Sequence, residues 1–310
     1  MQARTILRIG TRGSPLALAQ AHEVRARLAA AHGLPEDACE VRVYKTTGDA
    51  IQDRPLAEVG GKGLFTKEIE EALIAREIDL AVHSMKDMQT VLPDGLVVGA
   101  VLKREDVRDA FLSLKYGSLA ALPQGATVGT SSLRRQAQVK RIRPDLRVVG
   151  FRGNVQTRLK KLADGVADAT LLACAGLNRL GMADRITSPI APEEILPAVA
   201  QGAIAIEIRS DDAATAKAIA PLNDAATAVC VTAERAFLAR LEGSCRTPIA
   251  GLAELKGDGL TFRGMVFSVD GEQSFEITRE GPAEHAAALG TTAADALIEL
   301  GAEALLARSL

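Results

Sequence analysis

The residues most able to do chemistry in this sequence are arginines concentrated in one segment. Residues 134–158 contain eight basic side chains and a single acidic one, Asp145, which gives the segment a net charge of +7. The planar guanidinium group binds carboxylates and phosphates through paired hydrogen bonds, so the segment predicts a binding site for a polyanion. A solvated basic surface is the alternative. Several of these arginines lie at loop–helix junctions after predicted strands, where ligands of open α/β sheets bind, and this position favours the binding site.

Two loops that precede predicted helices carry further groups suited to anions. Thr130 and Ser131 supply hydroxyl groups beside the free backbone N–H groups of a helix N-terminus. Arg12 and Ser14 repeat this arrangement near the start of the chain, where a strand, a turn and a helix follow one another. Capping of the helix alone is the alternative for Ser14, although a cap can also face a ligand. The two loops together predict a cleft for a polyanionic small molecule, formed by two domains.

A polar group ends the apolar strand predicted at residues 78–83. An aspartate in this position, Asp87, can act as a general acid or base or can stabilise a cation, and the adjacent Lys86 can bind an anion. Capping of a helix N-terminus is the alternative role for Asp87. His83 is interpreted as a packed residue or a support for its neighbours, and not as a ligand-binding group.

The glycine-rich segment Gly60–Gly63 predicts a flexible lid and not a phosphate-binding loop. A glycine follows its lysine, Lys62, whereas the phosphate-binding loop requires Ser or Thr at that position. The surrounding stretch, residues 46–63, is long and weakly periodic, as expected of a lid over a binding cleft.

The cysteines indicate neither a zinc centre nor a disulfide framework. Cys39, Cys174, Cys230 and Cys245 lie far apart, without the paired spacing of zinc ligands. Cys174 and Cys230 are expected in the core, and Cys39 in a polar loop. Cys245 lies in a glycine-containing turn after a helix, and the adjacent Arg246 favours its thiolate. Cys245 is therefore a candidate nucleophile or covalent attachment point, with an incidental loop cysteine as the alternative.

Alternating strand and helix patterns over the first two thirds of the chain must position these residues. Strands are predicted at residues 7–9, 41–44, 78–83, 96–102, 126–129, 147–151, 169–174 and 203–208. Helices are predicted at residues 15–31, 64–76 and 154–163, around residue 178, and from Ser132 to about Pro144. This alternation predicts two α/β domains with parallel strands.

The last part of the sequence predicts a small α+β domain. A helix at 224–241 precedes strands at 247–255, 260–269 and 274–278, and helices follow from residue 291. We therefore expect three domains. Domain 1 takes residues 1–102 and 200–221, domain 2 takes residues 103–199, and domain 3 takes residues 222–310.

Composition excludes several classes of protein. Lys and Arg number 37 against 39 Asp and Glu, for a formal net charge of -2, and the chain has no Trp and 3% aromatic residues. A dedicated nucleic-acid-binding protein is usually basic and stacks bases on aromatic rings, so this class is disfavoured. No apolar stretch is long enough to predict a transmembrane helix, and the first nine residues lack the apolar region of a secretory signal. Free thiols in a reducing cytoplasm are the simplest interpretation.

Six motifs, in order along the chain, resemble the porphobilinogen deaminase (hydroxymethylbilane synthase) family. They are Arg12–Leu18 (RGSPLAL), Gly60–Phe65 (GGKGLF), His83–Asp87 (HSMKD), Gly129–Arg135 (GTSSLRR), Arg152–Asn154 (RGN) with Thr157 and Arg158, and Glu242–Cys245 (EGSC). The resemblance implies two periplasmic-binding-protein-like α/β domains flanking a cleft, plus the small C-terminal α+β domain. It also implies head-to-tail condensation of four porphobilinogen molecules into hydroxymethylbilane, with release of ammonia.

The resemblance further implies the roles of individual residues. A dipyrromethane cofactor would be attached through a thioether to Cys245, and Asp87 would be the catalytic residue. The residues expected to bind the cofactor are Cys245, Ser14, Lys86, Asp87, Thr130, Ser131, Arg134, Arg135 and Gly153. Those expected to bind substrate are Arg12, Ser14, Arg152, Arg158, Arg179, Phe65 and Lys62. No metal, nucleic acid or membrane is implied, and a cytoplasmic monomer is expected.

Two positions depart from the family pattern. Gln89 stands where proline is common, and Ser244 where glycine is frequent. Because proline fixes φ, Gln89 gives the loop after Asp87 more freedom. Two other functions are each consistent with part of the sequence. A two-lobed anion-binding protein fits the cleft but not the third domain with Cys245, and a nucleic-acid-binding protein would require steep salt dependence.

Overall fold

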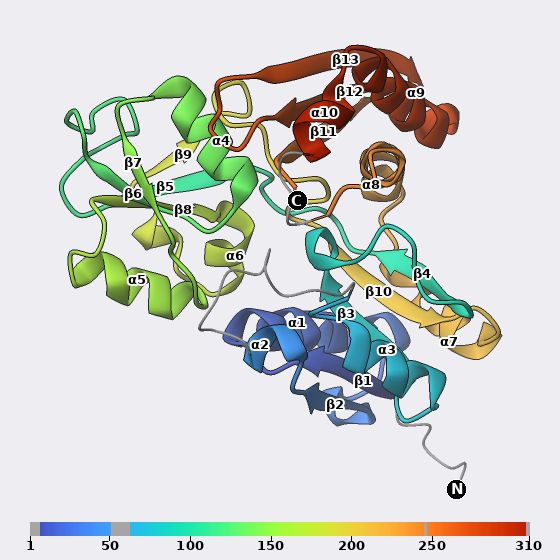
Figure 1. The fold of residues 1–310 in the computed structure, drawn as a ribbon. Coiled ribbons are helices and arrows are strands. Elements are labelled where there is room, and N and C mark those ends of the chain that lie inside the picture. Colours follow the sequence, from blue (N-terminus) through green and yellow to red (C-terminus); the bar gives the residue numbers. More distant parts are fainter. Residues whose placement is uncertain (1–6, 51–62, 245–246, 308–310) are drawn as a thin grey trace, which may run out of the picture. The chain divides into compact units, whose positions relative to one another are not determined.

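The computed structural model describes residues 7–50, 63–244 and 247–307 (Figure 1). The chain divides into two compact units. Of the described residues, unit 1 takes 7–50, 63–104 and 203–228, and unit 2 takes 105–202, 229–244 and 247–307. Since unit 2 combines residues 105–202 with the C-terminal part, the division into three domains stays a prediction. Within the described ranges, no helix is both long and apolar enough to cross a membrane.

Unit 1 contains a five-stranded sheet in the order β2-β1-β3-β10-β4. Its strands are β1 (Leu7–Arg12), β2 (Cys39–Tyr44), β3 (Leu80–Ser84), β4 (Leu96–Val101) and β10 (Ile204–Arg209). β1 pairs with β2 and β3 in parallel, as predicted, whereas β10 is antiparallel to both β3 and β4. The sheet is therefore mixed, because the chain returns in β10 from residues of unit 2 and inserts between two existing strands.

The first helix of unit 1 begins and ends at signals visible in the sequence. The helices of this unit are α1 (Pro15–His32), η1 (Glu36–Ala38), α2 (Thr47–Ala50), α3 (Lys67–Ile74), η3 (Met85–Asp87), α7 (Ala213–Ile219) and η5 (Ala220–Leu222). The Ser14 side chain accepts a hydrogen bond from the Ala17 N–H, and Gly33 ends α1 with φ of 60°, so both predicted limits of this helix are confirmed. α1 buries Ala21, Val24 and Leu28 against the sheet.

The first sheet of unit 2 has the order β7-β6-β8-β5-β9. Its strands are β5 (Asp109–Ser113), β6 (Thr127–Gly129), β7 (Arg147–Val149), β8 (Ala169–Ala173) and β9 (Ser188–Ile190), and its helices are α4 (Leu133–Ile142), α5 (Val155–Ala163), α6 (Cys174–Arg179) and η4 (Ala183–Arg185). The sequence patterns missed β5 and β9. β5 begins with a buried charge at Asp109, and β9 contains Pro189, which an edge strand tolerates.

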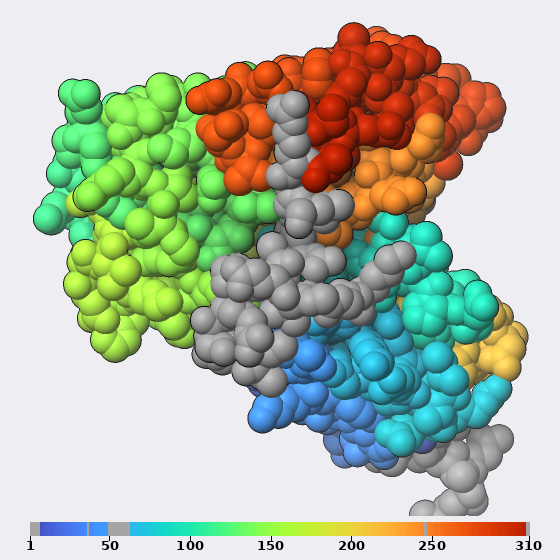
Figure 2. All heavy atoms as spheres, in the orientation of Figure 1, coloured from blue at the N-terminus to red at the C-terminus, as the bar shows by residue number. Residues whose placement is uncertain are grey.

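The C-terminal part of unit 2 confirms the predicted order of one helix, three strands and further helices. Its elements are α8 (Ala225–Arg240), β11 (Ile249–Lys256), β12 (Gly259–Phe267), β13 (Ser274–Pro282), η6 (Ala283–His285), α9 (Ala286–Glu299) and α10 (Ala302–Ala307), and the first turn of α8, up to residue 228, belongs to unit 1. The three strands form an antiparallel meander. In Figure 2 these residues, orange to red, form a continuous part of the surface. Leu252, Met265 and Phe267 of this sheet share a core cluster with Ala137 of α4.

The approach of α9 to α8 depends on a glycine. A Cβ atom at Gly290 would lie 2.0 Å from the carbonyl oxygen of Ala233, which belongs to the backbone of α8. Replacement of a helical glycine by alanine normally stabilises a protein by about 0.5–1 kcal/mol. We expect Gly290→Ala to have the opposite sign and to lower the free energy of unfolding by roughly 1–3 kcal/mol, because the helices must separate. Denaturant unfolding measures the change, and Ala287→Gly at an exposed site of α9 calibrates the propensity contribution. An increase in stability of Gly290→Ala would contradict this close packing.

Candidate functional site

A small open pocket of about 50 Å³ lies in unit 1. It is lined by residues that end or follow β1 and β3, together with residues of α1 and of the turn before α3. Four residues predicted from the sequence meet there, namely Arg12, Ser14, Phe65 and Asp87. Because β1 and β3 are parallel neighbours, their carboxyl ends lie at the same edge of the sheet. The topology therefore explains why side chains 75 positions apart reach one pocket.

The charged groups of this pocket are Arg12 and Asp87. Arg12 Nη1 lies 3.9 Å from Asp87 Oδ2, and their side chains are 20% and 32% exposed. This separation permits attraction but is too long for a hydrogen bond, so Asp87 Oδ2 is not fixed by a direct bond to Arg12 Nη1. The guanidinium carbon of Arg12 lies 4.2 Å from the centre of the Phe65 ring, which is a cation–π contact. The pocket thus presents a carboxylate, a cation and an aromatic face to a ligand.

Asp87 is held by the end of β3 and not by a helix cap. It is the last residue of the 3-10 turn η3, and Ser84 precedes that turn, so the alternative of Asp87 as a helix N-cap is wrong. The backbone N–H of Met85 donates to the carbonyl of Ala203, at 3.0 Å, next to β10. This bond ties the residues that carry Asp87 to the neighbouring strand. Lys86 lies in the same turn and is half-buried.

Sequence reasoning missed a polar pair in the same pocket. Gln20 of α1 and Ser84 are linked by a hydrogen bond in which Gln20 Nε2 lies 2.9 Å from Ser84 Oγ. Gln20 is buried although its helix otherwise buries alanine, valine and leucine. A polar residue on the apolar face of an amphipathic helix is the signal that would have indicated Gln20.

Gln89, which departs from the family pattern, packs beside Gly63. A Cβ atom at Gly63 would lie 2.6 Å from Gln89 Nε2, and Gly63 has φ of +72°. Gln89 therefore occupies the space that a side chain at this glycine would need. Two predicted site residues, Lys62 and Cys245, lie outside the described residues.

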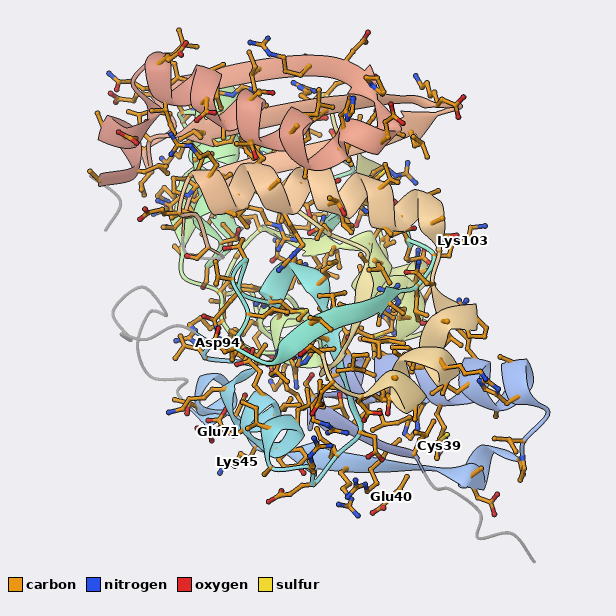
Figure 3. All side chains as sticks on the ribbon, turned by 90° about the vertical axis from the view of Figure 1, so that its right-hand side faces the viewer. Cys39, Glu40, Lys45, Glu71, Asp94 and Lys103 are labelled. Carbon is orange, nitrogen blue, oxygen red and sulfur yellow. The ribbon has the colours of Figure 1, made fainter. Side chains whose placement is uncertain are left out.

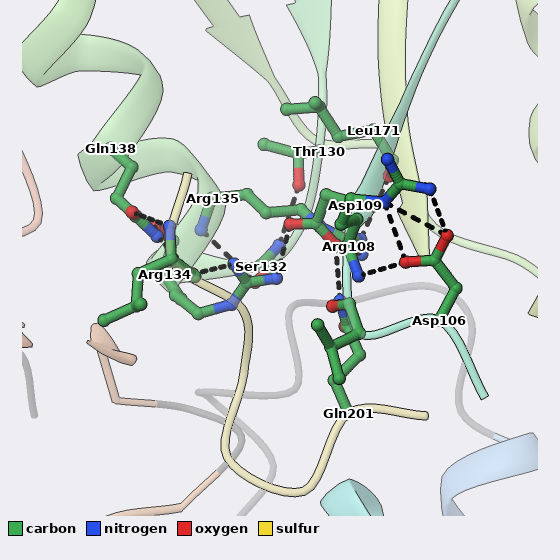
Figure 4. Close-up of polar contacts among 12 residues, drawn as sticks. Asp106, Arg108, Asp109, Thr130, Ser132, Arg134, Arg135, Gln138, Leu171 and Gln201 are labelled. Atoms are coloured by element: carbon green, nitrogen blue, oxygen red, sulfur yellow. Dashed lines mark hydrogen bonds and ion pairs between the residues drawn. The ribbon is translucent and has the colours of Figure 1, made fainter. Parts of the chain in front are cut away.

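In unit 2 the two adjacent arginines at the start of α4 are buried around one carboxylate (Figure 4). Asp109 Oδ2 lies 2.8 Å from Arg134 Nη2, and Asp109 Oδ1 lies 2.8 Å from Arg135 Nη2. The three side chains are 0%, 5% and 7% exposed, respectively. Burial favours the neutral acid, but the two guanidinium charges prevail and hold the pKa of Asp109 well below its usual range.

The ion cluster of Asp109, Arg134 and Arg135 carries one surplus positive charge. Further bonds hold it in place: Arg135 Nη1 donates to the Leu171 carbonyl at 3.0 Å, and Gln201 Nε2 donates to Asp109 Oδ1 at 2.9 Å (Figure 4). A buried surplus charge is costly unless an anion compensates it. The cluster therefore suits a ligand carboxylate. Asp109 itself was missed, because only its partners belonged to a recognisable basic segment.

Other members of the basic segment hold loops of unit 2 together. Arg143 pairs with Asp145, with Nη2 to Oδ2 at 2.7 Å, and this hydrogen bond lowers the pKa of Asp145 to about 2. Lys140 Nζ donates to the Leu146 carbonyl at 2.6 Å, and Arg147 Nε donates to the Gly125 carbonyl at 3.2 Å. These three basic residues have partners within the fold, and polyanion binding by the segment stays a prediction.

Three of the remaining predicted residues of unit 2 lie on loops that follow strands, namely Thr130, which is buried, Ser131, which is exposed, and Arg152, which is half-buried. Arg158 lies in α5, and Arg179 is the last residue of α6. Ser131 Oγ accepts a hydrogen bond from the Phe151 N–H at 2.8 Å, which joins the loops after β6 and β7. Two further sets of contacts complete the group. Arg158 Nε donates to the Gly153 carbonyl and Arg179 Nη2 to the Gly202 carbonyl, both at 2.9 Å.

Gly153 adopts a backbone conformation that requires glycine. Its φ is +120°, and a Cβ atom there would lie 2.6 Å from Thr157 Cγ2. The next residue, Asn154, caps α5 by accepting a hydrogen bond from the Thr157 N–H. The motif of Arg152, Gly153 and Asn154 thus shapes a turn that leads into a helix N-terminus.

The described cysteines, Cys39, Cys174 and Cys230, are buried. Cys39 lies in β2, which corrects its assignment to a polar loop. Burial raises the pKa of Cys174 to about 12, so this thiol is unsuited to act as a nucleophile. Among residues 7–50, 63–244 and 247–307, no group of His, Cys, Asp and Glu side chains could hold a metal ion.

Two family models match the chain. The model described as "Porphobilinogen deaminase, dipyromethane cofactor binding domain" matches residues 7–217, and the one described as "Porphobilinogen deaminase, C-terminal domain" matches residues 228–299. A porphobilinogen deaminase of Paracoccus denitrificans (strain Pd 1222) is 62% identical over 291 residues, which cover 94% of this chain and 93% of the relative. One of Nitrobacter winogradskyi is 59% identical over 295 residues, covering 95% and 93%.

The solved structures that resemble this one share less sequence identity with the chain than these two relatives do. A putative methionine-binding lipoprotein from Bacillus subtilis is 15% identical, with 71% of this chain and 90% of that chain covered and a TM-score of 0.43. A nutrient-binding protein from Burkholderia cenocepacia, bound to methionine, is 14% identical, with coverage of 69% and 90% and a TM-score of 0.43.

Proposed function

The chain belongs to the porphobilinogen deaminase family, and from that premise we propose how its residues carry out the condensation of four porphobilinogen molecules into hydroxymethylbilane. This transferase reaction belongs to tetrapyrrole biosynthesis and releases ammonia. The observation that carries the assignment is the match of both family domains, in order, over residues 7–217 and 228–299. A non-enzymatic anion-binding protein is not favoured, because the cofactor-binding domain is present.

The described residues fit a dipyrromethane cofactor. Each of its pyrrole rings carries carboxylate side chains, so its binding site must supply positive charge. Arg134 and Arg135 share one carboxylate, Asp109, and the surplus positive charge of this cluster suits a cofactor carboxylate. We assign the cofactor also to Ser14, Lys86, Asp87, Thr130, Ser131 and Gly153. The bound cofactor supplies the ring carbon from which the chain of pyrroles grows.

We assign catalysis to Asp87. Its carboxylate lines the unit 1 pocket and lies beyond hydrogen-bond distance of Arg12, so it can accept hydrogen bonds from a pyrrole N–H. Loss of the amino group leaves positive charge on the substrate's pyrrole ring, and a fixed carboxylate stabilises that charge where it develops. Arg12 would bind a substrate carboxylate, and Phe65 would cover one side of the ring.

We assign the remaining substrate carboxylates to arginines of unit 2. These are Arg152, Arg158 and Arg179, with Lys62 and Ser14 as further binding residues. Arg158 and Arg179 each donate a hydrogen bond to a backbone carbonyl of unit 2, so their guanidinium groups are already oriented before substrate arrives. Prior orientation lowers the entropy that binding must overcome. We further propose that the protein acts as a cytoplasmic monomer without a nucleic-acid or membrane partner, following the family resemblance.

We propose Cys245 as the attachment point of the cofactor, and intact-protein mass spectrometry tests this assignment. The purified protein should carry the added mass of two pyrrole units, and Cys245→Ala should abolish both the added mass and the activity. Ser244→Gly, the residue that the family favours at the adjacent position, is the matched control and should keep the adduct. An active wild-type protein without added mass would disprove the tether.

A further inference from the structure

Behind the pocket of unit 1 lies a buried group of three titratable side chains that the reaction as described does not use. His83 Nε2 lies 3.0 Å from Glu207 Oε2, and the two side chains are 3% and 0% exposed. They are diagonal neighbours on one face of the pair β3–β10, where His83 is opposite Ala205 and Glu207 is opposite Ala81. Glu70 of α3 is also buried, and it interacts electrostatically with His83 and with Glu207.

Two carboxyl oxygens of this group have no hydrogen-bond partner within the part of the chain that the structure describes. They are Oε1 of Glu70 and Oε1 of Glu207. A buried carboxylate oxygen without a donor is costly, and two such carboxylates close together are more so. Burial, strengthened by the negative charge of Glu207, raises the pKa of Glu70 above its usual range. These conditions favour a proton on Glu70.

The group is connected to the site through His83, which lines the same pocket as Asp87. The charged groups that face this region are Arg12 from β1, Asp87 from η3, Glu68 and Glu70 from α3, and Glu207 from β10, while α1 contributes the neutral Gln20. The pocket must accept a substrate that carries two carboxylates. Uncompensated charge on Glu70 and Glu207 would repel that substrate strongly, because the surroundings have a low dielectric constant.

We propose that Glu70, buried near the His83–Glu207 pair, holds a proton and so keeps the wall of the Asp87 pocket free of an added negative charge. The three are positioning residues, which act on substrate binding through the electrostatic potential of the pocket. This inference rests on the proposed function, because the carboxylates belong to porphobilinogen.

Steady-state kinetics as a function of pH tests the inference, with Glu70→Gln as the variant and Glu71→Gln as its control. Glutamine mimics the protonated acid but cannot ionise. Glu71 is the next residue of α3 and is exposed at the surface of unit 1 (Figure 3). As pH rises, wild-type protein and Glu71→Gln should show a common rise in KM for porphobilinogen. In Glu70→Gln we expect that rise to be at least about threefold smaller, with kcat at its plateau changed less than twofold.

Coincident KM profiles of Glu70→Gln and Glu71→Gln would overturn the inference, because a group with a merely structural role would leave this pH dependence unchanged. The pH dependence of the free energy of unfolding provides a second test, which does not require an activity measurement. Since the folded state binds the Glu70 proton more tightly than the unfolded state, wild-type stability should fall as pH rises above about 4.5, the ordinary value. The stability of Glu70→Gln relative to wild type should therefore increase from about pH 5 to about pH 8. A constant difference would overturn the inference and leave the family function untouched.

If Glu70→Gln does not fold, a measurement on the wild-type protein decides the question. Carbon-13 NMR of protein labelled at the glutamate side-chain carboxyl carbons reports the ionisation of each carboxyl group. One glutamate signal should remain protonated well above the ordinary glutamate range. Titration of all glutamate signals within that range would overturn the inference.

Discussion

Asp87→Asn is expected to lower kcat by at least about 10²–10³-fold while the protein stays folded and keeps its cofactor. Asparagine preserves the size of the side chain but removes the negative charge that faces the developing cation. The side chain is about one-third exposed, and its ion pair with Arg12 is loose, with 3.9 Å between Arg12 Nη1 and Asp87 Oδ2, so loss of this pair should cost little stability. The effect should therefore appear in turnover and not in stability.

Three measurements separate these outcomes. Consumption of porphobilinogen gives kcat and KM, intact mass gives the cofactor content, and thermal unfolding gives the stability. Asp94→Asn is the matched control, since Asp94 is an exposed aspartate of unit 1 that follows η3 (Figure 3) and makes no contribution to the pocket lining. A kcat of Asp87→Asn close to that of Asp94→Asn would remove the catalytic assignment.

Local signals in the sequence predicted local structure well. α1 begins at the Ser14 cap and ends at Gly33, as expected, because caps act within a few residues of the helix end. The antiparallel direction of β10 was not predictable in this way. It depends on pairing with β3 and β4, more than a hundred residues away, after the chain has passed through unit 2. Nothing in the residues of β10 themselves encodes that direction.

The same contrast holds for the site. The residues Arg12 and Asp87 could be predicted, because each follows a recognisable strand and parallel strands end at one edge. Asp109 and Glu207 could not, since their partners are 25 and 124 positions distant and each looks like a single charge within an apolar segment. The basic segment shows a different limit of sequence patterns. Charge density alone cannot distinguish Arg143, which binds nearby loop carbonyls, from Arg134, which surrounds a buried carboxylate.

Asp109→Asn should be the most damaging single change in unit 2. It removes the carboxylate that pairs with two buried guanidinium groups and leaves both without a counter-charge. Breaking a buried ion pair by removing one partner costs about 3–5 kcal/mol. Asp106→Asn is the control, because its ion pair with Arg108 is partly exposed (Figure 4) and should be worth about 0–1 kcal/mol. Denaturant unfolding measures both variants, and an equal loss of stability in Asp109→Asn and Asp106→Asn would contradict a structural role of the cluster.

The pH dependence of this effect has a definite sign. The folded state depresses the pKa of Asp109, so the unfolded state binds its proton more readily. Its contribution is therefore fully present above the ordinary value of 3.8 and is lost as pH falls through the lower value in the folded protein. The stability difference between wild type and Asp109→Asn should be constant from about pH 5 to neutrality and should shrink in stronger acid. A difference that instead grows in acid would contradict the depressed pKa.

Loading with cofactor should partly rescue Asp109→Asn. In wild-type protein a cofactor carboxylate would compensate only the surplus charge of the cluster, whereas in the variant it would face two guanidinium groups without another anion. A ligand stabilises the folded state in proportion to the logarithm of its affinity, so the loss of stability should be smaller with cofactor attached than without it. Unfolding of both forms, sorted by intact mass, measures this difference. Equal losses in the two forms would show that Arg134 and Arg135 support the fold alone, and the cofactor carboxylate would then need another cation.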